Sequence, residues 1–426
     1  MPVRDTFGLV PPGSELALDL FFVPFAMLFA FGMWRRMRGF GLWRAIVNSP
    51  GGIRSAIGRL GSNALLQHRV ALRPRGWPHL AIFFGFLVLL SATTIVAIDW
   101  DIARPLGFRV LAGARYLYFE VFVEALALAF VIGLLAALAW RLVRLRRVAR
   151  DQRRIQYQFL ILIGGLLYMG LTGFLLESLR LTIRPVPWAD WSFIGVRLAS
   201  ALSLIGIEHI AKSFYVVLWW SHAFVAFSLI ASLPYTAFLH AAAAPLNSMT
   251  QPGIPQRELN APFDLRTLMD AGDFDVKVGA ASVADLDAGQ RFALQACTNC
   301  GRCDEVCPAT AMGTALSPRW LVQKLRAKML SGSATQDLLA TDILAPAELW
   351  ACTTCAACVQ ACPVFIRPVD YIIPFRRELV ARQRLDKRQT EFLANLSLSG
   401  NAYGLPAERR NQLAAELRSA ARSSEE

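Results

Sequence analysis

The sequence predicts an all-α protein in two parts: five membrane-spanning helices, then a smaller helical domain with two four-cysteine motifs. Composition supports the membrane part, because 55% of the 426 residues are hydrophobic and only 18% are charged. The apolar residues concentrate before residue 245, and the remainder of the chain is polar. All eight cysteines lie in that polar remainder, in two runs of the same spacing. The chain therefore divides into a membrane part and a water-exposed part.

Five apolar runs are each long enough to cross about 30 Å of hydrocarbon as a helix. They cover residues 16–34, 79–98, 117–140, 159–179 and 214–233. The stretch 193–207 is also apolar apart from Arg197, and we interpret it as a helix at the outer surface rather than a sixth span.

The domain organisation follows from the change in composition. We expect a membrane domain with its five spans at 1–245, a linker at 246–290, a cysteine domain at 291–375 and a basic helical tail at 376–426. The tail is interpreted either as a docking arm for a partner or as an ordinary solvated helix.

Arginine in the loops predicts the orientation of the spans. The loops after the first and third spans carry nine and seven arginines, against three after the second. The positive-inside rule then places the N-terminus outside and the cysteine domain in the cytoplasm, at a bacterial inner membrane. This topology accounts for most of the net charge of +13, so we expect contact with membrane lipid and no nucleic-acid partner.

Every cysteine belongs to a run with the pattern C-x-x-C-x-x-C-x-x-x-C-P. The runs are Cys297, Cys300, Cys303 and Cys307, then Cys352, Cys355, Cys358 and Cys362. In two-cluster bacterial ferredoxins, three thiolates of such a run hold one [4Fe–4S] cube and the fourth crosses to the other cube. Crossover assigns Cys297, Cys300, Cys303 and Cys362 to cluster 1, and Cys352, Cys355, Cys358 and Cys307 to cluster 2. A zinc site or a redox pair explains a single CxxC, but not two complete runs.

The segment between the two runs predicts a helical type of dicluster domain. Residues 317–330 form an amphipathic pattern, with Ser317 as the expected N-cap and Pro318 in the first turn. Clusters of this kind are assembled in a reducing compartment, which agrees with the cytoplasmic side that the arginines predict.

Histidines are scarce, and three of the five suit a haem site. His222 and His240 are 18 residues apart, or five turns, so we expect them on one face of a continuous helix, near opposite membrane surfaces. His79 opens the second span at the level of His240. We predict that His79 and His240 are the axial ligands of a haem b, and that His222 serves a second haem whose other ligand is open. Ordinary helix-end histidines are the alternative.

Four charged residues in the spans suggest a quinone site. Glu120 and Glu124 are one turn apart in the third span, and Glu177 and Arg180 are three residues apart in the fourth. We expect all four near the outer side, where a quinone head group would exchange protons. The alternatives are a structural salt bridge between Glu177 and Arg180, and interhelical hydrogen bonds from the two other glutamates.

The membrane part resembles the gamma subunit of respiratory nitrate reductase, a five-span di-haem cytochrome b. The similar segments are PHLAIFFGF at the start of the second span and HAFVAFSLIASLPYTAFLH in the fifth. The resemblance implies that His79 and His240 hold the inner haem and that His222 holds the outer one. The family's other outer ligand falls at Leu89 in this sequence.

The cysteine part resembles the heterodisulfide-reductase-like membrane iron–sulfur oxidoreductases, which include fused electron-transfer-flavoprotein:quinone reductases. The similar segments are ACTNCGRCDEVCPA, LSPRWLVQKLR, ELWACTTCAACVQACPV and RRELV, with TGFLLESLRL in the fourth span. Fused relatives continue into cysteine-rich CCG domains. Since no cysteine follows Cys362, we expect the role of those domains to be either absent here or carried by a partner subunit.

These observations predict an electron-transfer subunit that links a cytoplasmic redox partner to the quinone pool through two [4Fe–4S] clusters and haem b. The partner would be a CCG-domain protein or a flavoprotein, and the chain would be the quinone-reactive subunit of a larger oxidoreductase. One alternative is a disulfide or sulfur-compound reductase with its own substrate site, although no cysteine is spare. The other is a scaffold subunit whose clusters only stabilise the fold.

Overall fold

A computed structural model describes residues 1–4, 6–47, 49, 51–145, 153–250, 259, 265–272 and 277–423. Within these ranges the chain forms helices and turns without a β-strand, and one isolated β-bridge joins Val3 to Ala112. The predicted all-α class is confirmed. The expected linker covers 246–290, and its residues 251–258 and 260–264 lie outside the described residues.

The chain folds into two compact units. Unit 1 contains Met1–Gly253, Gln295–Thr298 and Pro363–Phe365. Unit 2 contains Ile254–Leu294, Asn299–Cys362 and Ile366–Glu426. Two short segments, one that contains Cys297 and one that directly follows Cys362, therefore belong to the unit that holds the apolar helices.

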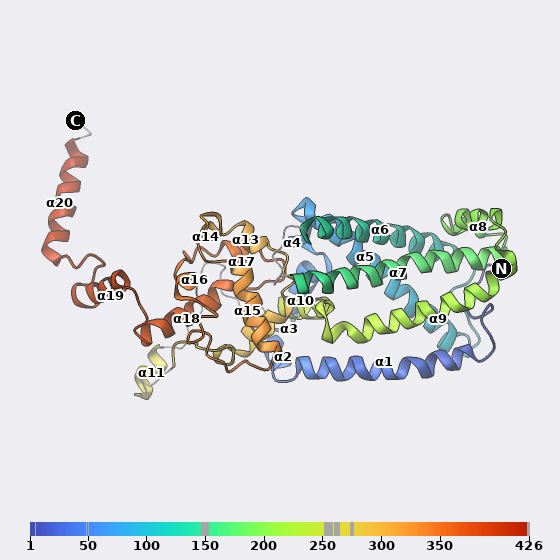
Figure 1. The fold of residues 1–426 in the computed structure, drawn as a ribbon, viewed down its shortest axis with the longest axis horizontal. Coiled ribbons are helices and arrows are strands. Elements are labelled where there is room, and N and C mark those ends of the chain that lie inside the picture. Colours follow the sequence, from blue (N-terminus) through green and yellow to red (C-terminus); the bar gives the residue numbers. More distant parts are fainter. Residues whose placement is uncertain are drawn as a thin grey trace. The chain divides into compact units, whose positions relative to one another are not determined.

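Within the described ranges, five helices of unit 1 are long and apolar enough to cross a membrane, as predicted. They are α1 (Ser14–Met37), α5 (Trp77–Ala97), α6 (Ala114–Leu145), α7 (Arg153–Ile183) and α9 (Glu208–Ser232). Figure 1 shows these helices side by side. The sixth apolar stretch forms only α8 (Gly195–Leu204), whose 10 residues are too few to span a bilayer.

Close packing joins α5, α6 and α7 in the core of unit 1. Phe130 and Leu134 of α6 are buried against Ile163 and neighbouring apolar residues of α7. A Cβ atom at Gly85 would lie 2.5 Å from the Cβ of Phe130, so only glycine lets α5 approach α6 this closely. Small residues at such crossings are typical of helices packed in membranes.

Along the chain, α1 and α5 are separated by shorter helices: α2 (Leu42–Val47), α3 (Gly52–Arg59), a π-helix (Leu60–Leu65) and α4 (His68–Ala71). Helix α10 (His240–Met249) packs against α3 and the π-helix. In α10, Asn247 Nδ2 donates a hydrogen bond of 2.7 Å to the carbonyl of Val364, which places the segment after Cys362 against this helix.

Unit 2 consists mostly of short helices. In chain order they are α11 (Leu265–Ala271), α12 (Ala288–Ala296), which ends in unit 1, α13 (Arg302–Glu305), α14 (Pro308–Ala311), α15 (Pro318–Leu330), α16 (Pro346–Trp350), α17 (Ala357–Ala361), α18 (Pro368–Ala381), α19 (Lys387–Ser399) and α20 (Ala407–Ser423). The predicted cap of α15 is confirmed, because Ser317 Oγ accepts a hydrogen bond from the Trp320 amide at 3.2 Å.

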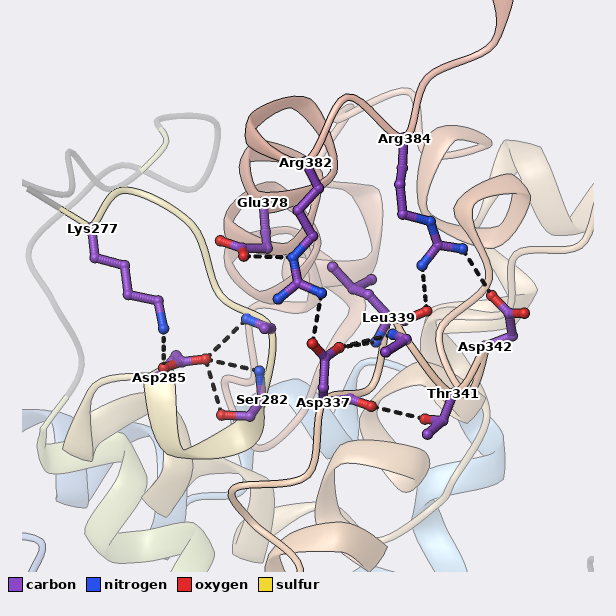
Figure 2. Close-up of polar contacts among 12 residues, drawn as sticks. Lys277, Ser282, Asp285, Asp337, Leu339, Thr341, Asp342, Glu378, Arg382 and Arg384 are labelled. Atoms are coloured by element: carbon purple, nitrogen blue, oxygen red, sulfur yellow. Dashed lines mark hydrogen bonds and ion pairs between the residues drawn. The ribbon is translucent and has the colours of Figure 1, made fainter.

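Helix α18 holds unit 2 together. It packs against α15, α16 and α17, and the expected boundary between 375 and 376 falls inside it. Just past its end, Arg382 and Arg384 pair with acidic residues on other segments, as Figure 2 shows. The first residues of the expected tail are therefore part of the folded cysteine domain.

Candidate functional site

A small pocket in unit 2 is lined by four cysteines. Three of them, Cys352, Cys355 and Cys358, come from the second motif, and the fourth, Cys307, comes from the first motif. The rest of the lining is mostly apolar, and consists of Pro308, Leu316, Pro318, Thr353, Ala356, Val369 and Ile372. The fold thus brings together the four residues that the crossover pattern assigns to cluster 2.

Local backbone geometry presents these thiols to the pocket. Cys307 is the N-cap residue of α14, and Cys358 lies in α17. Between Cys352 and Cys358 the chain turns through two left-handed residues, Thr354 and Ala356, with φ angles of 56° and 58°. The amide of Thr354 donates to Cys352 Sγ at 3.4 Å, a contact that orients the sulfur and stabilises negative charge on it.

The thiols fit a [4Fe–4S] cube better than a single metal ion. In a cube each ligand sulfur binds a different iron, so the sulfurs surround a cavity instead of converging on one point. In the described part of the chain, no three His, Cys, Asp or Glu side chains converge as a mononuclear site would require. Burial and the charge of neighbouring thiols raise the pKa of Cys358 to about 12, so its thiolate needs the positive charge of bound iron.

The first motif is divided between the two units. Cys297 follows α12 and belongs to unit 1, whereas Cys300, Cys303 and Cys362 belong to unit 2. Cys303 packs against the buried cluster that contains Cys358 and Val359. The amide of Ile366 donates to Cys362 Sγ at 3.3 Å, which repeats the N–H to sulfur contact of the second motif.

In both His222 and His240, the Nδ1 atom is held by a hydrogen bond, which leaves Nε2 available to bind a metal. The Thr172 hydroxyl donates to the Tyr168 carbonyl at 2.6 Å, so it accepts from His222 Nδ1, which lies 2.7 Å away. His240 Nδ1 lies 2.7 Å from the Ala237 carbonyl, which can only accept. These networks assign the proton of each neutral ring to Nδ1 and leave the lone pair on Nε2, the arrangement of an oriented metal ligand.

Space beside His222 also suits a flat ligand. A Cβ atom built at Gly173 of α7 would meet only His222 Cε1 within 4 Å, at 3.9 Å. His79 is the third residue of α5 and is exposed, as are His68 and His209. The residues present are therefore compatible with haem ligation by His222 and His240.

The expectation that His222 and His240 share one face of a continuous helix is wrong. Helix α9 ends at Ser232 and is followed by two 3₁₀ turns, Leu233–Tyr235 and Ala237–Leu239. Thr236 between them is extended, with φ of −122° and ψ of −177°, and His240 begins α10. Proline at 234 lacks the amide hydrogen that would continue α9, which explains the break.

Three of the four charged residues of the spans, Glu120, Glu177 and Arg180, form one ion-pair network at the ends of α6 and α7. Arg180 pairs with Glu177 at 2.5 Å and with Glu120 at 3.6 Å, and all three side chains are largely buried. The Tyr116 hydroxyl donates to Glu120. Glu124 has a different role, because its two oxygens accept from the amides of Ile194 and Gly195 at 3.0 and 2.7 Å, at the start of α8.

The sequence did not lead us to three residues near these sites: Tyr116, Thr172 and Arg376. Tyr116 is one turn before Glu120 on the same helix, a spacing that could have revealed it. Thr172 had no such signal, because its role depends on α7 packing against α9. Arg376 fell into the expected tail, yet its guanidinium donates to the carbonyl of Cys352 at 2.5 Å.

Fold and site together define a multi-pass membrane protein with a dicluster iron–sulfur domain. Residues 296–366 match the 4Fe-4S dicluster domain family, which confirms the iron–sulfur assignment of the motifs. No solved structure matches the chain significantly.

Curated relatives extend the similarity to the membrane part. The chain is 26% identical to EtfAB:quinone oxidoreductase of Syntrophomonas wolfei over 90% of its length, and 27% identical to the probable iron-sulfur-binding oxidoreductase FadF of Bacillus subtilis over 77%. It is 34% identical over 35% of its length to a probable membrane-anchored ferredoxin of Chromohalobacter salexigens, covering 26% of that protein. The resemblance to heterodisulfide-reductase-like membrane iron–sulfur oxidoreductases is confirmed. The chain spans about half the length of the first two relatives, 57% and 50%.

Proposed function

We propose that this chain is an electron-transfer subunit that passes electrons between a cytoplasmic redox partner and membrane quinone. The observation that carries the proposal is the pocket in which Cys307 joins Cys352, Cys355 and Cys358. Iron–sulfur clusters and haem supply one-electron carriers that proteins tune through ligands and hydrogen bonds. A relative similar over 90% of this chain is named as a quinone oxidoreductase, which supports quinone as the membrane partner.

The cysteines are proposed to divide by crossover. Cluster 2 takes the four pocket cysteines, and cluster 1 takes Cys297, Cys300, Cys303 and Cys362. The arginine-rich loops support a bacterial inner membrane, with the iron–sulfur domain in the cytoplasm. There the domain would meet a CCG-domain protein or a flavoprotein.

For haem b, the proposed ligands are His79 and His240, with His222 for a second haem. The protonated Nδ1 atoms of His222 and His240 support this assignment, since both rings are held by second hydrogen bonds. The test is H79A in the purified full-length chain, with H68A as the control because His68 is also exposed and lies in nearby α4. We expect H79A to lose the α-band of the inner haem and H68A to keep it. An intact α-band in H79A contradicts the pairing.

The buried acidic network is the proposed quinone site, with Glu120 as the group that exchanges protons with the head group. Arg4 Nη1 lies 4.0 Å from Glu120 Oε2, and among the described residues no hydrogen-bond acceptor reaches the buried Arg4 Nε. A quinone carbonyl is an acceptor of the kind that this donor lacks. Arg180 and Glu177 hold Glu120 in place, and Glu124 shapes the site by fixing the start of α8.

The decisive experiment is reduction of the purified full-length chain by a short-chain quinol. We expect cluster signals in electron paramagnetic resonance (EPR) to appear on addition of quinol. E120Q should slow this reduction about 10²-fold at unchanged iron and haem content, because it removes a proton-exchanging group. A preparation with clusters and haem that no quinol reduces and no quinone oxidises contradicts the proposed function.

A second candidate is reduction of a disulfide or other sulfur compound. It is favoured by similarity to iron-sulfur subunits of CoB–CoM heterodisulfide reductases, such as that of Methanopyrus kandleri, 30% identical over 22% of this chain and 42% of that protein. All eight cysteines are proposed as cluster ligands, which leaves no further thiol of this chain to react with a disulfide and weighs against this candidate. Release of thiols from a disulfide by the isolated, reduced chain would support this candidate over the first.

A further inference from the structure

Arg376 reaches from α18 to the backbone that carries Cys352. Its Nε and Nη2 atoms donate to the Leu349 carbonyl at 2.9 and 2.6 Å, and Nη2 also donates to the Cys352 carbonyl at 2.5 Å. The guanidinium lies over the ring of Trp350, 4.9 Å from the centroid. Three hydrogen bonds and one cation–π contact thus fix the position of this cation beside a proposed ligand of cluster 2.

Within the described residues, no carboxylate pairs with Arg376. All its hydrogen-bond acceptors are carbonyl oxygens, and none of the ion pairs found in the described ranges includes it. By contrast, Arg382 just past the end of α18 pairs with both Asp337 and Glu378. Arg376 is half-buried between α18 and the segment that carries Cys352. An arginine remains protonated in such a setting, so a full positive charge persists there.

A fixed positive charge near a cluster favours its reduced state. Reduction adds one negative charge to the cluster, and a nearby cation stabilises that charge more strongly where the surroundings are partly apolar. The pocket around Cys352 is lined mainly by apolar side chains, so water screens the interaction weakly. Reduction potentials of [4Fe–4S] clusters respond to local charge, hydrogen bonds and solvent exposure.

We propose that Arg376 holds the reduction potential of the cluster bound by Cys307, Cys352, Cys355 and Cys358 above the value that the same ligands would otherwise give. This inference rests on the proposed function, since it needs a cluster in that pocket. Arg376 then biases the distribution of electrons between the two clusters toward cluster 2. It acts through the field at the cluster and does not bind iron itself.

The test is an EPR-monitored redox titration of the full-length chain with both clusters. The signal of cluster 2 is first identified as the one missing in C355S. R376M removes the charge and keeps a similar side-chain volume, whereas R376K keeps the charge and loses the paired hydrogen bonds. We expect R376M to lower the potential of cluster 2 and leave cluster 1 unchanged, and R376K to retain most of the native potential.

R382M is the matched control, because it removes one positive charge just beyond the same helix where carboxylates already neutralise it. We expect no shift of either cluster in R382M. If R376M fails to assemble cluster 2, the comparison is made between R376K and R376Q. Equal potentials in the charged and neutral variants overturn the inference, as does an equal shift of both clusters. A wild-type preparation without cluster iron would instead contradict the proposed function.

Discussion

Arg382 donates to the carboxylate of Asp337 at 2.6 Å, and so joins the end of α18 to the loop between the two cysteine motifs (Figure 2). The same guanidinium pairs with Glu378 at 2.8 Å. Although burial raises the pKa of Asp337, the Ala340 amide and Arg382 outweigh it and hold that pKa below its usual value. The contact connects the end of α18 to a segment 45 residues earlier in the chain.

We expect R382Q to destabilise unit 2 modestly. Both partners are about one-third exposed, 31% and 35% of their side-chain surface, so solvent screening limits the pair to about 0.5–1 kcal/mol. A double-mutant cycle with D337N, measured by thermal unfolding of the full-length protein, gives the coupling energy between Arg382 and Asp337. A coupling energy indistinguishable from zero would show that the pair contributes nothing to stability.

Because of Asp285, the free energy of unfolding of the protein should depend on pH. Burial raises its pKa, but the hydrogen bond from Lys277 and those from the Ala281 and Ser282 amides lower it to about 2. Because the folded pKa is below the unfolded one, the stabilisation is complete above about pH 4 and is lost as the pH falls toward 2. We expect D285N to cost about 1 kcal/mol at pH 7, after allowance for solvent screening.

The measurement is denaturant unfolding of the native chain and D285N, followed by tryptophan fluorescence between pH 7 and pH 3. The difference in the free energy of unfolding between the two proteins should become smaller as the pH falls. Any effect of cluster loss that both proteins share cancels in this comparison. A difference that stays constant with pH means that the charge of Asp285 has no linked role.

Crossover of the fourth cysteine gives a prediction with an internal reference. C300S should abolish the EPR signal of cluster 1, and C355S that of cluster 2. Because Cys307 lines the pocket of the second motif, we expect C307S to match C355S and to lose about half of the iron. If C307S instead abolishes the same signal as C300S, each motif holds its own cluster and the crossover assignment fails.

E124Q should loosen the start of α8. The amide replaces one acceptor oxygen by a donor, so the Ile194 or Gly195 amide loses its partner, at a cost of about 1–3 kcal/mol. Hydrogen–deuterium exchange of peptides that cover 193–204 should become faster than in the native protein. The exposed Glu15 supplies a control, and exchange in E15Q should stay native. Native exchange in E124Q would show that other contacts hold α8.

Sequence reasoning reached the class of the fold and the number of spans for physical reasons that are local. A stretch of about 20 apolar residues can satisfy its backbone in lipid only as a helix, so length and composition identify α1, α5, α6, α7 and α9. Likewise, Ser317 followed by Pro318 is sufficient to start α15. The cysteine spacing indicated the dicluster domain because cube geometry constrains the ligands.

Contacts between distant segments were decided only in the tertiary structure. Periodicity alone placed His222 and His240 on one helix face, but Pro234 and the extended Thr236 end α9 between them. The hydrogen bond from His222 to Thr172 and the one from Arg376 to the Cys352 carbonyl join segments 50 and 24 residues apart. The sequence alone thus determined which residues can bind clusters and cross a membrane. Tertiary packing decided their neighbours, since charges, hydrogen bonds and burial depend on segments that meet only after folding.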